Sequence, residues 1–264
     1  VDLSFIILPE KPELEGKMQL KYLDFGIFTN DYHIGTSAIA NTQLFNETQN
    51  MLDVAIDNVR KSFELLIDFN EDKSEKLQKN EEYINFLNKN IVEFTTNAIS
   101  TEFPIEGSQT IGLFLKISAD IERIGDHAMN IAQRAERLYK ENNHFSHEAM
   151  DEIGIMSSVC VNILDELKIM NYDEFSGIVD KVDVIEENID KTHHQFSVNQ
   201  LSRLKDKRCT TENSVVYTKI LTDFERIGDH GLNIAKGFYK AREAMKAMKM
   251  VKPEMIEEVN SENA

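Results

Sequence analysis

The stretch Asp120-Ile-Glu-Arg-Ile-Gly-Asp-His127 returns, with one change, as Asp223-Phe-Glu-Arg-Ile-Gly-Asp-His230. The second copy follows the first by 103 residues, and the sequence around the two copies has diverged. A repeat at this spacing indicates duplication of a structural unit. Apolar residues flank both copies at intervals of three and four, which is typical of an amphipathic helix.

Composition supports a helical protein. The chain has 264 residues, of which 41% are hydrophobic, with few prolines and glycines. The formal net charge of −17 repels nucleic acid and anionic membranes, so neither is an expected partner. Cys160 and Cys209 lack metal-ligand spacing and favour a reducing compartment. The apolar run near the start is too short to cross a bilayer.

Helical periodicity appears in six segments, separated by polar breaks or by Pro104 and Gly107. Short connections favour antiparallel neighbours. We therefore expect an all-α fold of two tandem antiparallel three-helix bundles, residues 36–143 and 144–249. Residues 1–35 are predicted to form a strap or linker with an apolar patch at Tyr22 to Phe25, and residues 250–264 a flexible tail. The predicted helices cover about residues 36–67, 74–100, 109–140, 146–170, 172–204 and 211–248.

The repeated stretch places carboxylates in a stripe separate from the apolar one. Glu122 and Asp126 stand four residues apart, as do Glu225 and Asp229. Like charges at this spacing repel on a helix, and a cation relieves the repulsion. Two ligands are too few for a firm site, so a neighbouring helix must add oxygen atoms. The sequence offers Glu82 and Asn85 in the first half, and Glu187 and Asp190, with Asp183 and Glu186 nearby, in the second.

A structural interpretation competes with the metal site. Acidic pairs on helices usually form a solvated face, and Arg123 or Arg226 could neutralise them. Other residues of the repeat also have ordinary explanations. Asp120 and Asp223 can pair with the following Arg, Gly125 and Gly228 can permit close helix approach, His127 and His230 are more typical packing or hydrogen-bonding residues than ligands, and His193-His194 is more typical of a polar surface pair.

The extended copies, Asp120-Ile-Glu-Arg-Ile-Gly-Asp-His-Ala-Met-Asn-Ile-Ala132 and Asp223-Phe-Glu-Arg-Ile-Gly-Asp-His-Gly-Leu-Asn-Ile-Ala235, resemble the signature of the PhoU family. The resemblance covers about residues 36–249. It implies two three-helix bundles with surface metal clusters, a regulatory rather than enzymatic role in bacterial phosphate uptake, and Fe or Zn, with Mg or Mn as alternatives. The metal ligands it implies are Glu122, Asp126, Glu225 and Asp229, with Glu187 and Asp190 on the facing helix.

A second resemblance concerns the strap. Lys21-Tyr-Leu-Asp24 is similar to the entry into the cytoplasmic PhoU-like region of bacterial sodium/phosphate cotransporter proteins, and a first residue other than Met agrees with an excised domain. We therefore expect a cytoplasmic regulatory domain attached in cis to a membrane transporter domain. The alternative is a free-standing PhoU-type regulator acting in trans on a sensor kinase and a phosphate ABC transporter. Self-association stays open, and a metal-dependent hydrolase is the least favoured class.

Overall fold

The computed structural model describes residues 18–28, 36–100, 105–168 and 177–250, and all regular structure within them is helical. No helix in these ranges is long and apolar enough to cross a membrane. The described elements are a short 3-10 helix, η1 (Phe25–Phe28), and six long helices: α1 (Thr36–Ile67), α2 (Glu71–Ser100), α3 (Ile105–Lys140), α4 (His147–Lys168), α5 (Ile178–Lys205) and α6 (Thr211–Met250).

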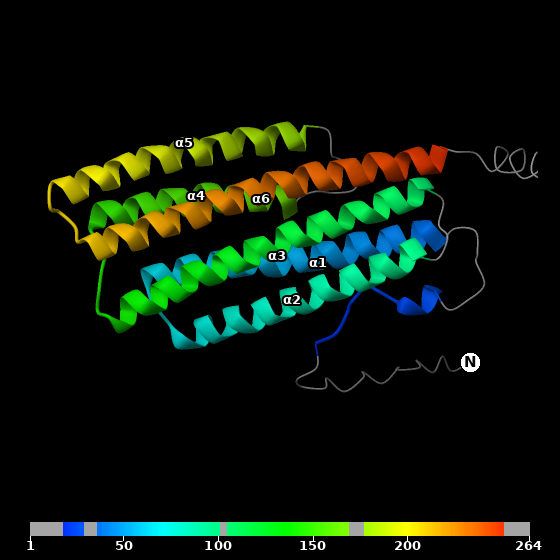
Figure 1. The fold of residues 1–264 in the computed structure, drawn as a ribbon, viewed down its shortest axis with the longest axis horizontal. Coiled ribbons are helices and arrows are strands. Elements are labelled where there is room, and N and C mark those ends of the chain that lie inside the picture. Colours follow the sequence, from blue (N-terminus) through cyan, green and yellow to red (C-terminus); the bar gives the residue numbers. More distant parts are fainter. Residues whose placement is uncertain (1–17, 29–35, 101–104, 169–176, 251–264) are drawn as a thin grey trace, which may run out of the picture.

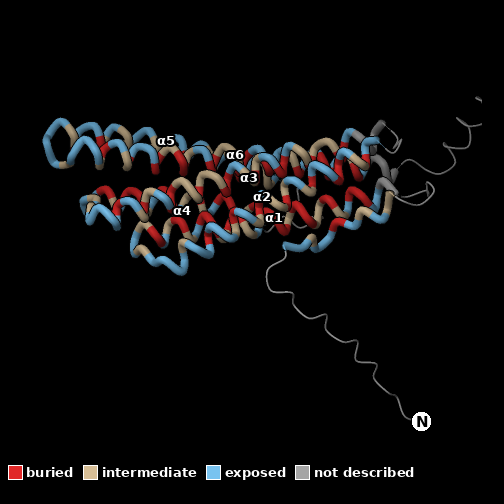
Figure 2. Tube along the Cα trace, turned by 60° about the horizontal axis from the view of Figure 1, so that its bottom comes forward, coloured by how far each residue is buried: buried red, intermediate tan, exposed pale blue. Residues whose placement is uncertain are grey.

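The six helices form the two predicted three-helix bundles, α1 to α3 and α4 to α6. Figure 1 shows α3 and α6 running side by side through the centre of the molecule, where they make the most extensive contact between the bundles. Helices α1 and α4 also touch. Buried residues follow the inner faces of all six helices (Figure 2), and most of them belong to one continuous apolar core. The two bundles are therefore fused along α3 and α6 rather than separated by a linker.

Helix starts follow local capping. The Asn70 side chain accepts the Lys73 backbone N–H at 2.9 Å, so α2 begins at Glu71, three residues before the predicted start. Ser146 and Thr210 cap α4 and α6 in the same way. Gly107 lies within α3 rather than in a turn, which corrects the predicted boundary. The predicted start of the fifth helix and the predicted tail from residue 251 lie outside the described residues.

Close approach of α3 and α6 depends on a glycine. A Cβ atom built on Gly237 of α6 would lie 2.7 Å from Cγ1 of Ile117 on α3, closer than real carbon atoms approach. Nearby, the rings of Phe45 on α1 and Phe238 on α6 meet edge to face with centroids 5.5 Å apart. At this point the seam between the bundles therefore consists of the α6 backbone and apolar side chains in direct contact.

The strap is fastened to the first bundle by one buried carboxylate. Glu47 on α1 is fully buried, and its Oε2 atom accepts the backbone N–H groups of Lys21, Tyr22 and Leu23 at 3.0, 2.7 and 3.2 Å. Leu23 is buried, and Phe25 packs edge to face on Phe94 of α2. The predicted apolar patch of the strap is therefore a docking segment, seen in blue beside the first bundle in Figure 1.

A polar network is buried near the tip of the second bundle. Glu152 on α4 accepts hydrogen bonds from Arg203 on α5 at 2.6 Å, from Asn199 at 2.7 Å and from the Tyr217 hydroxyl on α6. These hydrogen bonds hold the pKa of Glu152 below its usual value although burial acts in the opposite direction. The Arg203 guanidinium also lies over the Tyr217 ring, 5.0 Å from its centroid. The network joins all three helices of the bundle.

Removing Arg203 should destabilise the protein strongly. In the Arg203→Leu variant Glu152 stays buried without its cationic partner, and we expect a loss of about 3–5 kcal/mol in the free energy of unfolding. The matched control is Arg208→Ala, which breaks the exposed Arg208–Glu148 pair and should cost at most about 1 kcal/mol. Denaturant unfolding measures both, and equal effects would contradict a structural role for the buried network.

Candidate metal centre

The repeated segments of α3 and α6 face each other through two reciprocal hydrogen bonds. His127 Nδ1 lies 2.8 Å from Asp223 Oδ1, and His230 Nδ1 lies 2.8 Å from Asp120 Oδ1. The two imidazole rings stack on each other, with centroids 5.8 Å apart. Each copy of the motif therefore supplies the aspartate for the histidine of the other copy.

These contacts correct one expectation and confirm another. Asp120 and Asp223 pair with the opposite histidine instead of the Arg that follows in their own segment, and Asp223 also binds Arg134. The histidines act as hydrogen-bonding residues, as predicted. By fixing α3 against α6, the pairs also fix the outward direction of the carboxylates one residue before each histidine.

The first acidic cluster lies between α2 and α3. Glu122 and Asp126 project from α3, and Glu81 projects from α2 toward Gly125, whose missing side chain leaves room for it. A Cβ atom on Gly125 would lie 2.5 Å from Glu81 Oε2. Glu81 is only 7% exposed, and among the described residues its Oε2 atom has no hydrogen-bond partner. The Oε1 atom accepts a hydrogen bond from the Asn85 side chain at 3.3 Å.

Burial and mutual repulsion raise the pKa of two carboxyl groups in this cluster. Burial raises the pKa of Glu81 to about 7, and repulsion from Asp126 and Glu122 adds to the effect. Burial and Asp126 also raise the pKa of Glu122, while Arg123 and His230 oppose the rise. Arg123 stays exposed, 3.6 Å from Asp126 and 3.8 Å from Glu122, so its compensation is partial. Without a further cation, three carboxylates share this site unfavourably.

The second cluster repeats the arrangement between α5 and α6 with more negative charge. Glu186, Asp190 and Asp229 each offer an oxygen atom, and these atoms all lie within 4.8 Å of one another. Burial, followed by Asp190 and Asp229, raises the pKa of Glu186. Glu225 extends the cluster along α6, and its pKa is raised by burial and by Asp229.

Close helix approach again shapes this cluster. A Cβ atom on Gly228 would lie 2.8 Å from Cδ1 of Ile189, so the glycine brings α5 onto α6 next to the acidic residues. On the exposed side, Arg226 binds Asp229 at 2.8 Å and lies 3.4 Å from Glu225. The structural interpretation, in which each acidic pair is a solvated face neutralised by an arginine, therefore describes part of the arrangement, since an arginine lies beside each pair.

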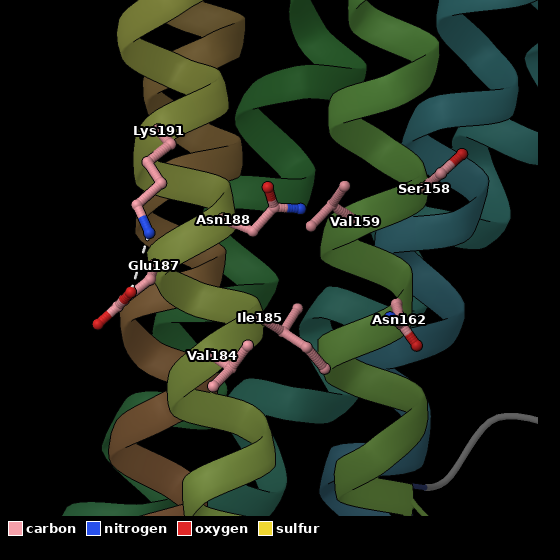
Figure 3. Close-up of a pocket in the computed structure, with 8 residues that line it drawn as sticks. All are labelled: Ser158, Val159, Asn162, Val184, Ile185, Glu187, Asn188 and Lys191. Atoms are coloured by element: carbon pink, nitrogen blue, oxygen red, sulfur yellow. Dashed lines mark hydrogen bonds and ion pairs between the residues drawn. The ribbon is translucent and has the colours of Figure 1, made fainter.

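Two residues chosen from the sequence, Glu82 and Glu187, lie outside the clusters. Glu82 is exposed. Glu187 binds Lys191 at 2.9 Å, and both residues line the groove between α4 and α5 together with Ile185 and Asn188 (Figure 3). Their neighbours Glu81 and Glu186 occupy the positions facing α3 and α6. Asn85 and Asp190 lie on the cluster side of their helices, since Asn85 donates a hydrogen bond to Glu81 and Asp190 lies beside Glu186 and Asp229.

The sequence does carry a signal that distinguishes Glu81 and Glu186 from their neighbours. Both facing helices carry a Glu-Glu doublet, in Glu81-Glu-Tyr-Ile-Asn85 and Glu186-Glu-Asn-Ile-Asp190. The shared isoleucine at the fourth position contacts the motif glycine in each half. The glutamate three residues before that isoleucine lies on the same helix face, whereas the second glutamate of the doublet is turned about 100° further.

The donor sets suit a metal ion. Carboxylate oxygens are the ligands of hard and borderline cations such as Mg, Mn and Fe, and Zn also accepts them. The unpartnered Glu81 Oε2, aimed into the first cluster beside a glycine, is the group that a cation would satisfy. A bound cation would supply positive charge at the point where several carboxylates converge. Within the described residues, three carboxylates that could share one ion converge at α5–α6, and the α2–α3 cluster contributes the buried Glu81.

Comparison with known proteins shows the family. The PhoU domain model matches residues 48–135 and 153–237, one match in each bundle and together more than half of the chain. The chain therefore belongs to the PhoU family. The matched ranges contain both copies of the repeated segment and both acidic clusters, so the clusters lie within the family domain.

Several relatives and solved structures are similar to this chain. The phosphate-specific transport system accessory protein PhoU homolog 1 of Thermotoga maritima is 26% identical, over 74% of this chain and 84% of the relative. The PhoU homolog of Clostridium acetobutylicum is 23% identical over 74% and 88%. The crystal structure of PhoU from Pseudomonas aeruginosa superposes with a TM-score of 0.70 at 21% identity, covering 77% of this chain and 97% of that one. The fold is shared with this structure along nearly its whole length.

The buried Glu81 carboxylate should make the metal-free protein sensitive to pH. Because the pKa is higher in the folded state, the destabilisation grows as pH rises from 4.5, the usual value, to about 7, and is complete above that. In chelator-treated protein, Glu81→Gln should raise the melting temperature little near pH 4.5 and most above pH 7. The exposed neighbour provides the control, Glu82→Gln, which should change nothing. A Glu81→Gln effect independent of pH would refute this account.

Proposed function

We propose that this chain is a metal-binding regulatory protein of phosphate uptake that acts in trans, on the cytoplasmic side, on a phosphate transporter and its sensor kinase. The observation that carries the proposal is the pair of acidic clusters in a PhoU family domain. The first cluster contains a buried carboxylate, and the second contains three converging carboxylates. The printed names of the relatives, accessory proteins of the phosphate-specific transport system, supply the physiological context. The role is regulatory rather than enzymatic.

The chain's own residues define what such a centre would do. Glu81 would bind from α2 while Glu122 and Asp126 bind from α3, and Glu186 and Asp190 from α5 would meet Glu225 and Asp229 from α6. A metal in this position joins two helices and cancels part of the local negative charge. The partner would then meet a bundle surface whose charge and stiffness depend on metal loading. Fe and Zn are the preferred ions, with Mg and Mn as alternatives.

Metal content tests the proposal directly. Protein purified without chelator should contain bound metal by elemental analysis, and Asp126→Ala combined with Asp229→Ala should remove most of it, because each change deletes a ligand. The matched control combines Glu82→Ala with Glu187→Ala, which removes the same charge from residues outside the clusters. Equal metal content in all three proteins would reject the centres. A large fall in melting temperature of the first variant in metal-free buffer would indicate a structural role instead.

Partner binding tests the regulatory part. The purified chain, loaded with metal, should bind the cytoplasmic portion of the phosphate sensor kinase in a calorimetric titration. The variant carrying both Asp126→Ala and Asp229→Ala should bind it more weakly, since its surface charge no longer depends on metal. A metal-loaded chain without measurable affinity for either the kinase or the phosphate transporter would contradict action in trans.

A second candidate is the same regulatory role in cis, as the cytoplasmic domain of a sodium/phosphate cotransporter-like protein. The observation that favours it is the strap, which precedes the matched family region and is fixed on α1 by Glu47. A membrane domain upstream would pull directly on this docked segment. The encoding gene decides between the two forms: hydrophobic spans upstream of Val1 support attachment, and an initiator Met a few codons before it, without such spans, excludes it.

A further inference from the structure

The strap binds across two helices of the first bundle. On α1, Glu47 accepts three successive backbone N–H groups of the strap, and Gln43 accepts a fourth, from Asp24, at 3.0 Å. On α2, the Tyr83 hydroxyl donates a hydrogen bond to the Gln19 carbonyl at 3.0 Å. Because the same short segment is bound to both helices, it holds α1 and α2 relative to each other.

Apolar contacts strengthen the hold on α2. The rings of Phe25 and Phe28 both lie against the Phe94 ring, with centroids 5.4 and 4.8 Å from it. Leu23 is only 8% exposed and belongs to the same continuous core as Phe94. Tyr83 and Phe94 lie eleven residues apart, which is about three helical turns. The strap therefore supports α2 along that length.

Another face of the same stretch of α2 is packed on α3. Glu81 lies two residues before Tyr83, and Ile84 lies one residue after it. A Cβ atom on Gly125 of α3 would lie 2.5 Å from Glu81 Oε2 and 3.1 Å from Ile84 Cδ1, so these two side chains occupy the space beside the glycine. A movement of α2 would therefore change the position of Glu81 in the first acidic cluster.

The second bundle holds the equivalent glutamate with its own side chains. Glu152 on α4 follows Glu47 on α1 by 105 residues, the interval that also separates the Glu-Glu doublets of α2 and α5. Arg203 and Asn199 of α5 bind Glu152 at 2.6 and 2.7 Å. In the described part of the chain, every hydrogen bond to the Glu152 carboxylate comes from α5 or α6. The contact between α4 and α5 therefore needs no strap.

We infer that the strap is a latch for α2, so that the α2–α3 contact at the first acidic cluster depends on a docked strap and the α5–α6 contact at the second cluster does not. A docked strap holds α2 on α1 and Glu81 against α3. A detached strap leaves α2 without support between Tyr83 and Phe94, and α2 then loosens locally. Displacement of the strap thus changes one acidic cluster and leaves the other unchanged. This inference goes beyond the proposed function, because it requires no bound metal.

Hydrogen exchange followed by mass spectrometry tests the latch in the full-length, chelator-treated protein. The test variant is Leu23→Asp, which places a charge at the buried residue of the strap and alters no residue of either bundle. The matched control is Tyr22→Asp, which adds the same charge at the neighbouring side chain, 47% exposed. The measurement compares the amides of residues 77–94 in α2 with those of residues 182–199, the equivalent part of α5.

Leu23→Asp should speed exchange in α2 about tenfold or more and leave α5 unchanged, because only α2 loses support. Tyr22→Asp should leave both helices as they are in the wild type. Equal acceleration in α2 and α5 would overturn the latch, since it indicates a global loss of stability. Unchanged α2 exchange in a variant whose strap amides have lost protection would overturn it as well.

A second strap variant keeps the test decisive if Leu23→Asp does not fold or if its strap stays protected. Tyr22→Pro removes the backbone N–H that lies 2.7 Å from Glu47 Oε2 and leaves every side chain of the two bundles in place. Faster exchange in α2 alone supports the latch, and unchanged exchange in α2 overturns it. Because no metal is present in these measurements, their outcome is separate from that of the metal-binding proposal.

Discussion

The reciprocal His–Asp pairs between α3 and α6 are the constraint on which the rest of the molecule depends. His127 with Asp223 and His230 with Asp120 fix the rotation of both central helices about their axes. With the rotation fixed, the apolar stripes turn into one shared core and the carboxylate stripes turn outward. The glycine at Gly237 then allows the two helices to approach closely along their length. The shared core, the seam and both acidic clusters all involve α3 or α6, the two helices that these pairs join.

The clusters combine features that a stable surface would avoid. Glu81 is buried beside two like charges, and its neighbour Gly125 lies inside a helix, where glycine costs about 1 kcal/mol relative to Ala. Gly125 makes room for the Glu81 side chain, and a cation between the carboxylates would offset the cost of the buried charge. In the first cluster Arg123 compensates from the exposed side, and Glu81 Oε2 is left without a hydrogen-bond partner among the described residues. This arrangement is the reason for proposing a cation site there in place of a solvated acidic face.

The fold was largely predictable because helical periodicity extends over long segments and the repeat announces two similar units. The pairing of Asp120 and Asp223 with the opposite histidines was not, because it depends on the way two distant helices face each other. Which of Glu81 and Glu82 faces α3 could not be predicted for a related reason: adjacent glutamates differ only in helical angle, and the position of Glu81 depends on its contact with Gly125 in space. The early start of α2 could have been predicted from Asn70, which is a capping residue. Asn70 lies within the polar break and was interpreted as part of it.

The reciprocal pairs follow the rule of an isologous interface, in which residue i meets j and j meets i about a two-fold axis. The seam is thus organised as a homodimer within one chain, with the stacked imidazoles close to the axis. A true homodimer must present identical residues on both sides, and a covalently joined pair escapes that restriction. Arg134 and Gly237 hold equivalent positions in the two halves, as do Asn88 and His193. Joining the halves released the two sides to diverge around a preserved axis, so that one scaffold can offer two unlike binding surfaces.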